Sequence, residues 1–429
     1  MKGKLVLGLC SMFLGACGGS GGSDGSSGSG PNTPSARLVG DFFQQATACD
    51  LRVANTSVQI VVHKKDGSVA AVHWPDSNGH LDIPWPADAE HLTLIKNTNG
   101  ALDIDTALDF SGEDLGIRVS YDASLNESCE CKTLVVDPSQ LMSTYPEHSI
   151  YLQGNKVVES SSRSFCKVPG QQYSSVDLWL TPSQSNDNAY GALLDINANM
   201  EQLELTPGMV SGSNNMGQEV SFYEPYGDVD YLRVYGLNAD GRRHQMGTPS
   251  PLYVFPGIHS NNFLQGYRTK FLGSTAEGEM TYHAARRMKV TDPGQMQNLE
   301  IADNDQQLLV AVNALLQGFD SDSAVNYNIE GIGSGRAGLF VWVYGPGLDW
   351  SIDGPLKGTV PDLNLPPDVE TLFETKTISS ISFSSSGYRQ SGGINELRKQ
   401  LATESRSGSK LRPAFFDNYD YEEIRVNVY

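Results

Sequence analysis

The stretch that decides the fold is VQIVVHKKDGSVAAVHWPDSNGHLDIPWPADAEHLTLI, from Val58 to Ile95. Apolar and polar residues alternate along it, which is typical of β-strands with one buried face. Asp66-Gly67 is a dipeptide typical of a two-residue hairpin turn, and Asp76-Ser77-Asn78-Gly79 is a second turn signal. Four short strands are therefore predicted: Ser57–Val62, Ser68–His73, His80–Trp85 and His91–Lys96.

The same pattern continues along the chain, because short apolar runs are separated by Gly, Pro, Asn, Asp and Ser. Further strands are expected at Leu134–Val136, Val176–Leu180, Val229–Tyr235, Leu308–Val312, Leu339–Tyr344, Ile378–Phe383 and Glu423–Val428. Helical periodicity is scarce. Its best case is Ile394–Glu404, with Ile394, Leu397 and Leu401 on one face, and Glu277–Met288 is a second candidate helix. The sequence predicts an all-β fold with minor helical insertions.

The segment Val58–Ile95 resembles the start of a carboxypeptidase-regulatory-like or transthyretin-like β-sandwich. In that family a strand, a DG turn, a second strand, an acidic-x-x-Gly turn and another strand follow one another. The resemblance implies a binding or spacer module rather than a catalytic domain. We expect two or three β-sandwich (transthyretin-like or Ig-like) domains in tandem. The expected divisions are a signal peptide 1–16, a linker 17–36, and domains 37–122, 123–272 and 273–429, the last with a short helix near 394–404.

Residues 1–17 have the layout of a secretory signal. Lys2 and Lys4 supply positive charge, and Leu5–Leu14 forms an apolar run too short to span a bilayer. The stretch Leu14-Gly15-Ala16-Cys17 resembles the lipobox of bacterial lipoproteins. In that family the cysteine thiol receives diacylglycerol, the peptide is cut before it, and the new amino terminus is acylated. The resemblance implies lipid attachment, with palmitate as the usual acyl group, at Cys17. An ordinary secretory signal with a cysteine beside its cleavage site is the alternative.

The segment after Cys17 has the composition of a flexible tether. Gly18–Gly30 contains only Gly and Ser apart from Asp24. A flexible coil over residues 18–36 spans about 25 Å, from the square-root dependence of span on length. Gly18 and Gly19 stand where enterobacterial lipoproteins retained in the inner membrane have Asp. This likeness implies anchoring in the outer membrane, on its periplasmic face or at the cell surface.

The charge balance restricts the classes of partner. The chain has 50 Asp and Glu against 30 Lys and Arg, which gives a formal net charge of −20. Such a surface repels nucleic acid and anionic headgroups, so we expect no nucleic-acid partner. After Cys17, too, no apolar run is long enough for a membrane-spanning helix.

Four cysteines follow Cys17, and an even number in an exported protein favours disulfides. Cys129 and Cys131 flank Glu130, so on a strand they point to the same face and are poorly placed to pair with each other. Each is expected to bond to Cys49 or Cys166, and the connectivity stays open. A zinc site is the alternative, but the spacing matches no zinc pattern.

Candidate ligand-binding residues are few. Trp74, Trp85 and Trp350 stand beside turns and acidic residues, so their rings are candidates for stacking on a sugar. The acidic pairs Asp303/Asp305 and Asp320/Asp322 resemble calcium ligands at alternate positions, but neither continues into an EF-hand. We expect no cofactor, with structural calcium as a weak alternative.

Motif searches reveal no catalytic signature: the chain lacks G-x-S-x-G, H-E-x-x-H and a P-loop. The sequence predicts an outer-membrane lipoprotein that acts as a binding, structural or adhesive module, with a glycan or an envelope protein as partner. The alternative is an envelope hydrolase that cleaves polysaccharide with paired carboxylates.

Overall fold

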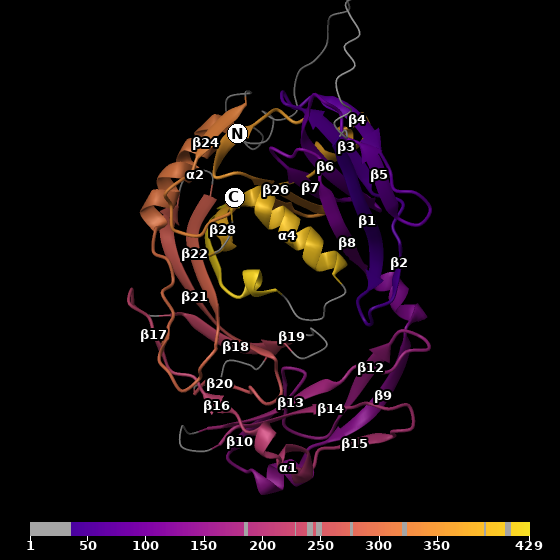
Figure 1. The fold of residues 1–429 in the computed structure, drawn as a ribbon, viewed down its shortest axis with the longest axis vertical. Helices are drawn as coiled ribbons and strands as arrows, with labels where there is room; N and C mark the ends of the chain where they lie inside the picture. Colours follow the sequence, from indigo (N-terminus) through magenta and orange to yellow (C-terminus); the bar gives the residue numbers. More distant parts are fainter. Residues whose placement is uncertain are drawn as a thin grey trace, which may run out of the picture.

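The computed structural model describes residues 36–183, 188–227, 229–237, 243–245, 251–274, 278–319, 324–389, 392–407 and 413–429. Strands make up 49 % of the structure and helices 15 %, in several open antiparallel and mixed sheets. The expectation of a mostly β fold with few helices is therefore confirmed. Figure 1 shows the strands of residues 37–122 at the upper right, those of 130–204 at the bottom, and the remainder on the left and in the centre.

The largest unit is a sheet of twelve strands. Neighbouring strands are antiparallel except for one parallel pair, β7 and β26, which joins strands that are far apart in the chain. In spatial order the strands are β19 (Arg243–Gln245), β18 (Tyr231–Leu237), β21 (Asn261–Ser274), β22 (Gly278–Lys289), β29 (Tyr419–Val428), β28 (Ser380–Tyr388), β25 (Gly338–Gly345), β26 (Leu348–Gly354), β7 (Ala101–Ala107), β6 (Ala89–Thr98), β3 (Gln59–Lys64) and β4 (Val69–His73).

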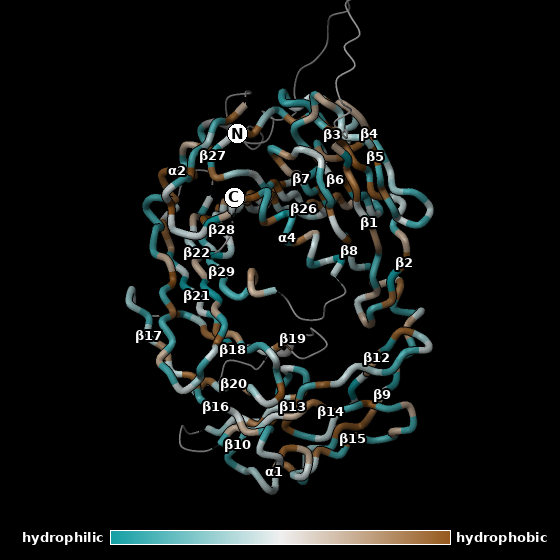
Figure 2. Tube along the Cα trace, viewed as in Figure 1, coloured by the Kyte–Doolittle hydropathy of each residue, from teal (hydrophilic) through white to brown (hydrophobic). Residues whose placement is uncertain are grey.

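A second sheet covers one end of the first. It contains β2 (Arg52–Ala54), β1 (Arg37–Ala46), β5 (His80–Pro84) and β8 (Asp114–Asp122), with β8 parallel to β1. Side chains of β1 and β5 pack against those of β3 and β6 in a closed apolar core, and hydrophobic stretches of these strands come together in Figure 2. The two layers form a sandwich.

β3 is buried on both faces, which explains why Ile60, Val61 and Val62 follow one another without a polar residue between them. Ile60 and Val62 point into the sandwich core, whereas Val61 points into the larger core on the opposite side of the twelve-stranded sheet. The hairpin predicted at Asp66-Gly67 is present, with β3 and β4 antiparallel and Gly67 at a φ of +86°. A strand covered on both sides does not need the alternation of a half-exposed strand.

The middle region has its own apolar core between two small sheets. One sheet contains β11 (Asn155–Val157), β10 (His148–Leu152), β13 (Val176–Pro182) and β14 (Tyr190–Leu194); the other contains β12 (Ser161–Lys167), β9 (Glu130–Asp137) and β15 (Gln202–Glu204). Three short pairs complete the described strands: β16 (Gln218–Glu219) with β20 (Tyr253–Val254), β17 (Phe222–Tyr223) with β23 (Gln297–Asn298), and β24 (Val325–Asn328) with β27 (Lys357–Val360).

The α-helices of the described chain are α1 (Ser139–Thr144), α2 (Asp305–Phe319), α3 (Pro367–Phe373) and α4 (Ile394–Arg406). Short 3-10 turns are η2 (Ala123–Ser128), η3 (Pro207–Val210), η4 (Ser213–Asn215) and η5 (Ala414–Phe416). The helix expected at Ile394–Glu404 is α4, which lies beside β8 (Figure 1). In the described part of the chain, no helix is both long and apolar enough to cross a membrane.

Two local expectations are wrong. The candidate helix Glu277–Met288 coincides with strand β22, and the expected strand Leu308–Val312 lies inside helix α2. In β22 the neighbours β21 and β29 satisfy the backbone on both edges, so pairing decides the conformation. In α2 the buried residues Leu308, Val312 and Leu315 recur at helical spacing. The apolar run Leu308–Val312 by itself suits a buried strand as well as a buried helix.

Two structural observations bear on the expected division into three domains. Strands from 37–122 and from 273–429 belong to the same twelve-stranded sheet. The expected boundary at 272/273 falls within β21, whereas the one at 122/123 falls at the end of β8. The division itself stays a prediction.

Candidate functional site

Two disulfides lie close together in sequence and structure. Cys49 is bonded to Cys129, and Cys131 is bonded to Cys166. Two disulfides were expected from four cysteines, and the structure decides their connectivity. Cys49 lies in the turn between β1 and β2, Cys129 follows η2, and Cys131 and Cys166 face each other across the β9–β12 pair.

A polar cavity of about 310 Å³ lies next to both bridges. One wall is the turn 45–50 together with Tyr121 of β8, and the other is the segment Cys166–Val168 with Gln171, Gln172 and Ser174. We call this cavity the disulfide pocket. It therefore lies between the first sandwich and the middle region, on the right of Figure 1 where β2 and β8 approach β12.

The first wall is held in shape by hydrogen bonds. Ala46 N donates to Leu51 O at 2.9 Å, which closes the turn after β1. Gln45 is 8 % exposed, and its side-chain oxygen accepts a hydrogen bond from Arg52 Nε at 2.7 Å. On the far side of the turn, Ala48 N donates to Asn126 Oδ1 of η2 at 2.8 Å. The turn is therefore fixed to η2 by hydrogen bonds as well as by the Cys49–Cys129 bridge.

The second wall carries a neutralised positive charge. Lys167 Nζ lies 3.0 Å from Glu130 Oε2 and 5.2 Å from the centre of the Tyr173 ring. Its side chain is only 12 % exposed, so the ammonium group is occupied by these two partners. Beyond it the chain turns at Gly170, with a φ of +78°, and presents Gln171 and Gln172 to solvent.

The three candidate tryptophans lie outside this pocket and apart from one another. Trp74 follows β4 and is 55 % exposed. Trp85 is 8 % exposed and packs edge-on against Phe110 at 5.3 Å. Trp350 is 2 % exposed and donates from its indole nitrogen to Thr106 Oγ1 at 3.0 Å. The rings of Trp85 and Trp350 are therefore buried, and of the three Trp74 alone keeps an exposed ring; the stacking role itself stays a prediction.

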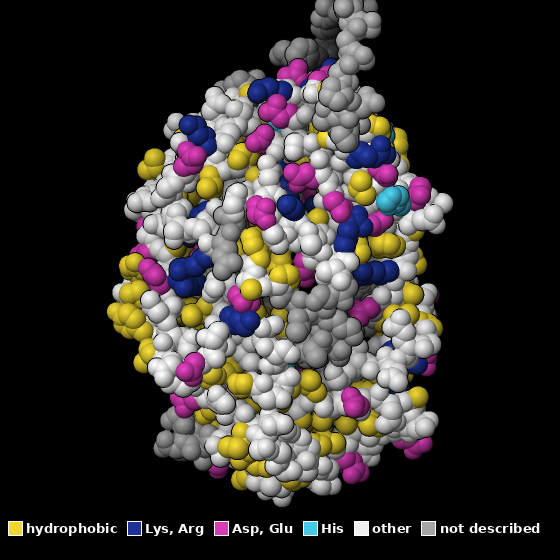
Figure 3. All heavy atoms as spheres, viewed as in Figure 1, with side chains coloured by type: hydrophobic (Ala, Val, Ile, Leu, Met, Phe, Trp, Pro, Cys, Tyr) yellow, Lys and Arg dark blue, Asp and Glu magenta, His cyan; other side chains and the backbone are white. Residues whose placement is uncertain are grey.

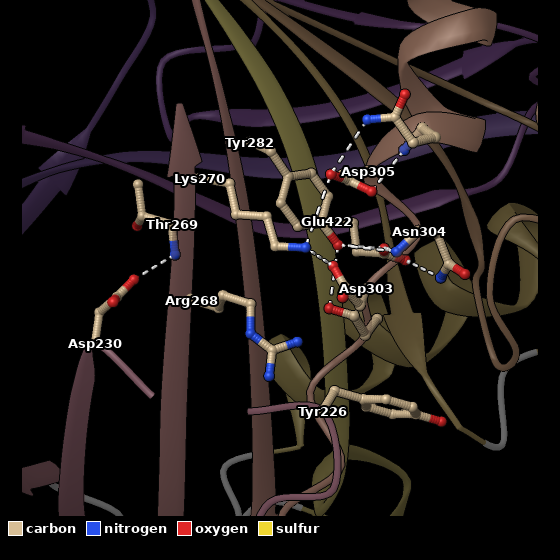
Figure 4. A network of polar contacts seen from close by, with 12 residues as sticks. Tyr226, Asp230, Arg268, Thr269, Lys270, Tyr282, Asp303, Asn304, Asp305 and Glu422 are labelled. Carbon is tan, nitrogen blue, oxygen red and sulfur yellow. Dashed lines mark hydrogen bonds and ion pairs between the residues drawn. The ribbon is translucent and has the colours of Figure 1, made fainter. Parts of the chain in front are cut away.

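The candidate calcium ligands that are described form ion pairs instead (Figure 4). Asp303 contacts Lys270 Nζ, and Asp305 Oδ2 lies 3.7 Å from the same nitrogen. An ammonium group between the carboxylates leaves no place for a calcium ion there. Among the described residues, no group of three or more His, Cys, Asp or Glu side chains could hold a metal. Asp320, Asp322 and the predicted lipid attachment site Cys17 lie outside the described residues.

The network in Figure 4 is structural. Tyr282 donates to Glu422 Oε1 at 2.6 Å, and the backbone N–H of Asn304 donates to the same oxygen at 3.1 Å. Glu422 is completely buried and also pairs with Arg336. These contacts fix the segment before α2 to the sheet. Burial raises the pKa of Tyr282 far above its ordinary value, with the Glu422 charge as a second cause, so this hydroxyl stays a donor.

Neighbouring carboxylates of the kind that the hydrolase alternative requires occur on β7 and β26. Asp349 is the register neighbour of Asp103, and Asp105 follows two residues further along β7. Partial burial, then the charges of Asp103 and Asp105, raise the pKa of Asp349. Lys96 pairs with Asp103 at 2.8 Å. These acids lie on the twelve-stranded sheet, on a different part of the fold from the disulfide pocket.

Comparison with known proteins adds no identification, since no protein-family model, curated protein or solved structure matches the chain. The disulfide pocket was not predicted from the sequence. Its walls come from three segments that are far apart in the chain, and only the cysteines pointed towards it.

Proposed function

We propose that the protein is a lipid-anchored lipoprotein of the bacterial outer membrane, whose folded body is a binding module with the disulfide pocket as its ligand site. The single observation that carries the binding role is the polar cavity of about 310 Å³ framed by two disulfides. A volume of this size is at the lower end of the range for small-molecule sites, about 300–1,000 Å³.

Location is supported by two independent features. The layout of residues 1–17 resembles a lipoprotein signal, and Gly18–Gly30 has the composition of a tether. Disulfides persist in oxidising compartments such as the periplasm and the cell surface, so the two bridges favour export. One acyl chain binds a membrane only marginally, and two or more hold it stably, so the anchor rests on complete acylation of Cys17.

The modular organisation is part of the same proposal. The core shared by β1, β5, β3 and β6 supports a first β-sandwich in residues 37–122, and the separate core of the middle region supports a second unit. The rims of such modules carry loops, which are common places for ligand sites. The disulfide pocket lies at such a junction.

Replacing the predicted acylated cysteine tests the anchor. Cys17→Ser is expected to abolish incorporation of labelled palmitate and to remove the protein from the outer-membrane fraction. Cys10→Ser is the matched control, because Cys10 lies within the signal that is removed, and it should label and fractionate as wild type. Labelled, membrane-bound Cys17→Ser protein would refute the anchor.

Filling the cavity tests the ligand site. A ligand that binds only the folded protein raises its melting temperature by mass action. We expect the low-molecular-mass fraction of an envelope extract to stabilise the wild type but not Ala48→Trp, which places a large side chain at an exposed position of the pocket lining. Equal stabilisation of both proteins would place the ligand elsewhere, and no stabilisation of the wild type would contradict the binding role.

A further inference from the structure

We propose that the ligand of the disulfide pocket is a neutral saccharide of one or two sugar rings, stacked on Tyr121 and hydrogen-bonded by the glutamines of the second wall. This inference rests on the proposed function and specifies its ligand. Its support comes from the chemistry of the lining, the exposed aromatic ring, the local charge and the volume.

The polar groups of the lining are mostly uncharged. Ser174 has a hydroxyl, and the exposed Gln171 and Gln172 have carboxamides, whereas the hydroxyl of Thr47 is hydrogen-bonded to the Asn126 side chain, at 3.1 Å from Oδ1 and 2.7 Å from Nδ2. A carboxamide donates through its nitrogen and accepts through its oxygen, and a hydroxyl does both. A ligand that matches such a lining needs several closely spaced groups that can each donate and accept hydrogen bonds. Sugar hydroxyls meet this requirement.

Tyr121 offers a ring face for stacking. It is 71 % exposed and lines the cavity, in contrast to the buried Trp85 and Trp350. It stands on β8 directly beside Gln45 of β1, in a parallel pair whose register continues from Asp41 to Ala46. The backbone of Tyr121 is therefore fixed, so a ligand that covers its ring causes little further loss of backbone conformational entropy. An aromatic face that packs on the C–H face of a sugar leaves the hydroxyls free to bond at the ring edge.

Local charge excludes anionic sugars. Among the described residues that line the cavity, the only cationic side chain is Lys167, which Glu130 neutralises at 3.0 Å, whereas Asp50 adds a carboxylate. The whole chain has a net charge of −20, and the lower region in Figure 3 shows acidic side chains and almost no basic ones. An acidic saccharide would meet repulsion at long and short range. A neutral saccharide meets none.

Binding of sugars to the full-length folded body tests the proposal. Glucose, galactose, N-acetylglucosamine, maltose and cellobiose are titrated by calorimetry, with glucuronic acid as the charged comparison. We expect at least one neutral sugar to bind and glucuronic acid to bind at least tenfold more weakly. Tyr121→Ala should weaken binding about tenfold, because it removes the ring on which the sugar stacks. Tyr121→Phe keeps the ring face and should stay within about threefold.

Tyr223→Ala is the matched control, because Tyr223 is also exposed, at 58 %, but lies on β17 away from the pocket. It should bind as wild type. Sugar binding that is unchanged in Tyr121→Ala, or stronger for glucuronic acid, would overturn the inference. If no neutral sugar binds while the envelope extract still stabilises wild type but not Ala48→Trp, the ligand class is wrong and the binding role survives. If the extract also fails, the proposed function fails with it.

Discussion

His63 is a completely buried histidine in a hydrogen-bonded chain that crosses the twelve-stranded sheet. Its Nδ1 lies 3.1 Å from Gly67 O and its Nε2 lies 2.9 Å from Thr93 Oγ1. Because a carbonyl oxygen only accepts, Nδ1 carries the proton and Nε2 accepts from Thr93. Thr93 is 3.1 Å from Thr106, which accepts from Trp350 at 3.0 Å. The chain links β3, β6, β7 and β26.

This burial predicts a loss of stability in acid. Burial lowers the pKa of His63 from 6.5 to about 4, so between these values the unfolded chain binds a proton that the folded protein does not. Stability therefore falls as pH decreases through this window. The expected loss between pH 7.5 and 4.5 is about 2–3 kcal/mol, since each pKa unit corresponds to about 1.36 kcal/mol.

Urea unfolding of wild type and His63→Gln at the two pH values checks the prediction. A glutamine side chain does not titrate, so the variant should lack this part of the pH dependence. His80→Gln replaces a histidine whose side chain is 45 % exposed and serves as control. Wild-type and His63→Gln stabilities that change in parallel would contradict it.

Tyr121 and the three tryptophans show why residue type was a poor guide to the site. Trp74, Trp85 and Trp350 were candidates because they stand beside turns, yet Trp85 and Trp350 are buried, whereas Tyr121, which was not a candidate, is exposed. A turn signal locates the end of a strand but does not reveal which layer will cover it. The covering layer comes from residues distant in the chain.

At the scale of elements, the two disulfides restrain the pocket differently. Cys131 and Cys166 are register neighbours in the antiparallel β9–β12 pair, so backbone hydrogen bonds already hold them together. Cys49 lies in a turn whose ends are closed by hydrogen bonds between β1 and β2, and the Cys129 bridge and the bonds to Asn126 fix this turn to η2. The Cys131–Cys166 bridge therefore adds stability, whereas the Cys49–Cys129 bridge also fixes the wall of the disulfide pocket.

Removing each bridge separately tests this difference. For sequence separations of 80 and 35, the chain-entropy model gives about 4.5 and about 3.8 kcal/mol, so the double variants Cys49→Ser/Cys129→Ser and Cys131→Ser/Cys166→Ser should lose similar stability. Hydrogen exchange should accelerate in the turn 45–52 only in the first variant. Equal acceleration there in both variants would show that the β9–β12 bridge also restrains the turn.

The two wrong assignments of secondary structure have one cause. Leu308–Val312 is an apolar run that suits a buried strand or a buried helix, and Glu277–Met288 contains residues that suit either state. Intrinsic preferences of this kind amount to a few tenths of a kcal/mol per residue. Strand pairing on both edges of β22 and burial of one face of α2 outweigh them.

At the scale of the whole molecule, the β7–β26 pair makes the stability of residues 37–122 depend on the rest of the chain. Val61, Ile95, Leu102 and Ile104 are at most 2 % exposed because they belong to the large core, whose other members come mostly from residues 179–424. Exposing a side chain of this kind costs about 1.5–3 kcal/mol. The four together amount to about 6–12 kcal/mol, comparable with the whole stability of a domain, about 5–15 kcal/mol.

We therefore expect residues 37–122, expressed alone, to lack a stable monomeric fold and to aggregate through the uncovered edge of β7. Size-exclusion chromatography and thermal unfolding check this outcome. A variant fragment with Ile104→Thr and Leu102→Thr should be more soluble, because it presents less apolar surface. A monodisperse wild-type fragment that unfolds cooperatively would contradict the prediction and support an independent first domain.

The sequence by itself determined the local features of this protein. Alternation and short apolar runs identified β3, β4, β5 and β6 of the first region and β25, β28 and β29 of the last. Asp66-Gly67 identified a hairpin, and Ile394, Leu397 and Leu401 identified α4. The number of cysteines predicted two disulfides. These features depend on residues close together in the chain, so a short window contains their physical cause.

Only the tertiary structure decided which elements meet. Every strand edge offers the same backbone donors and acceptors, so the choice of β26 as the partner of β7 depends on how both faces of the sheet are covered. The same holds for the disulfide pocket, where residues 45–50, Tyr121 and 166–174 become neighbours. Free energy from packing over the whole chain selects these contacts, and no single segment of sequence contains it.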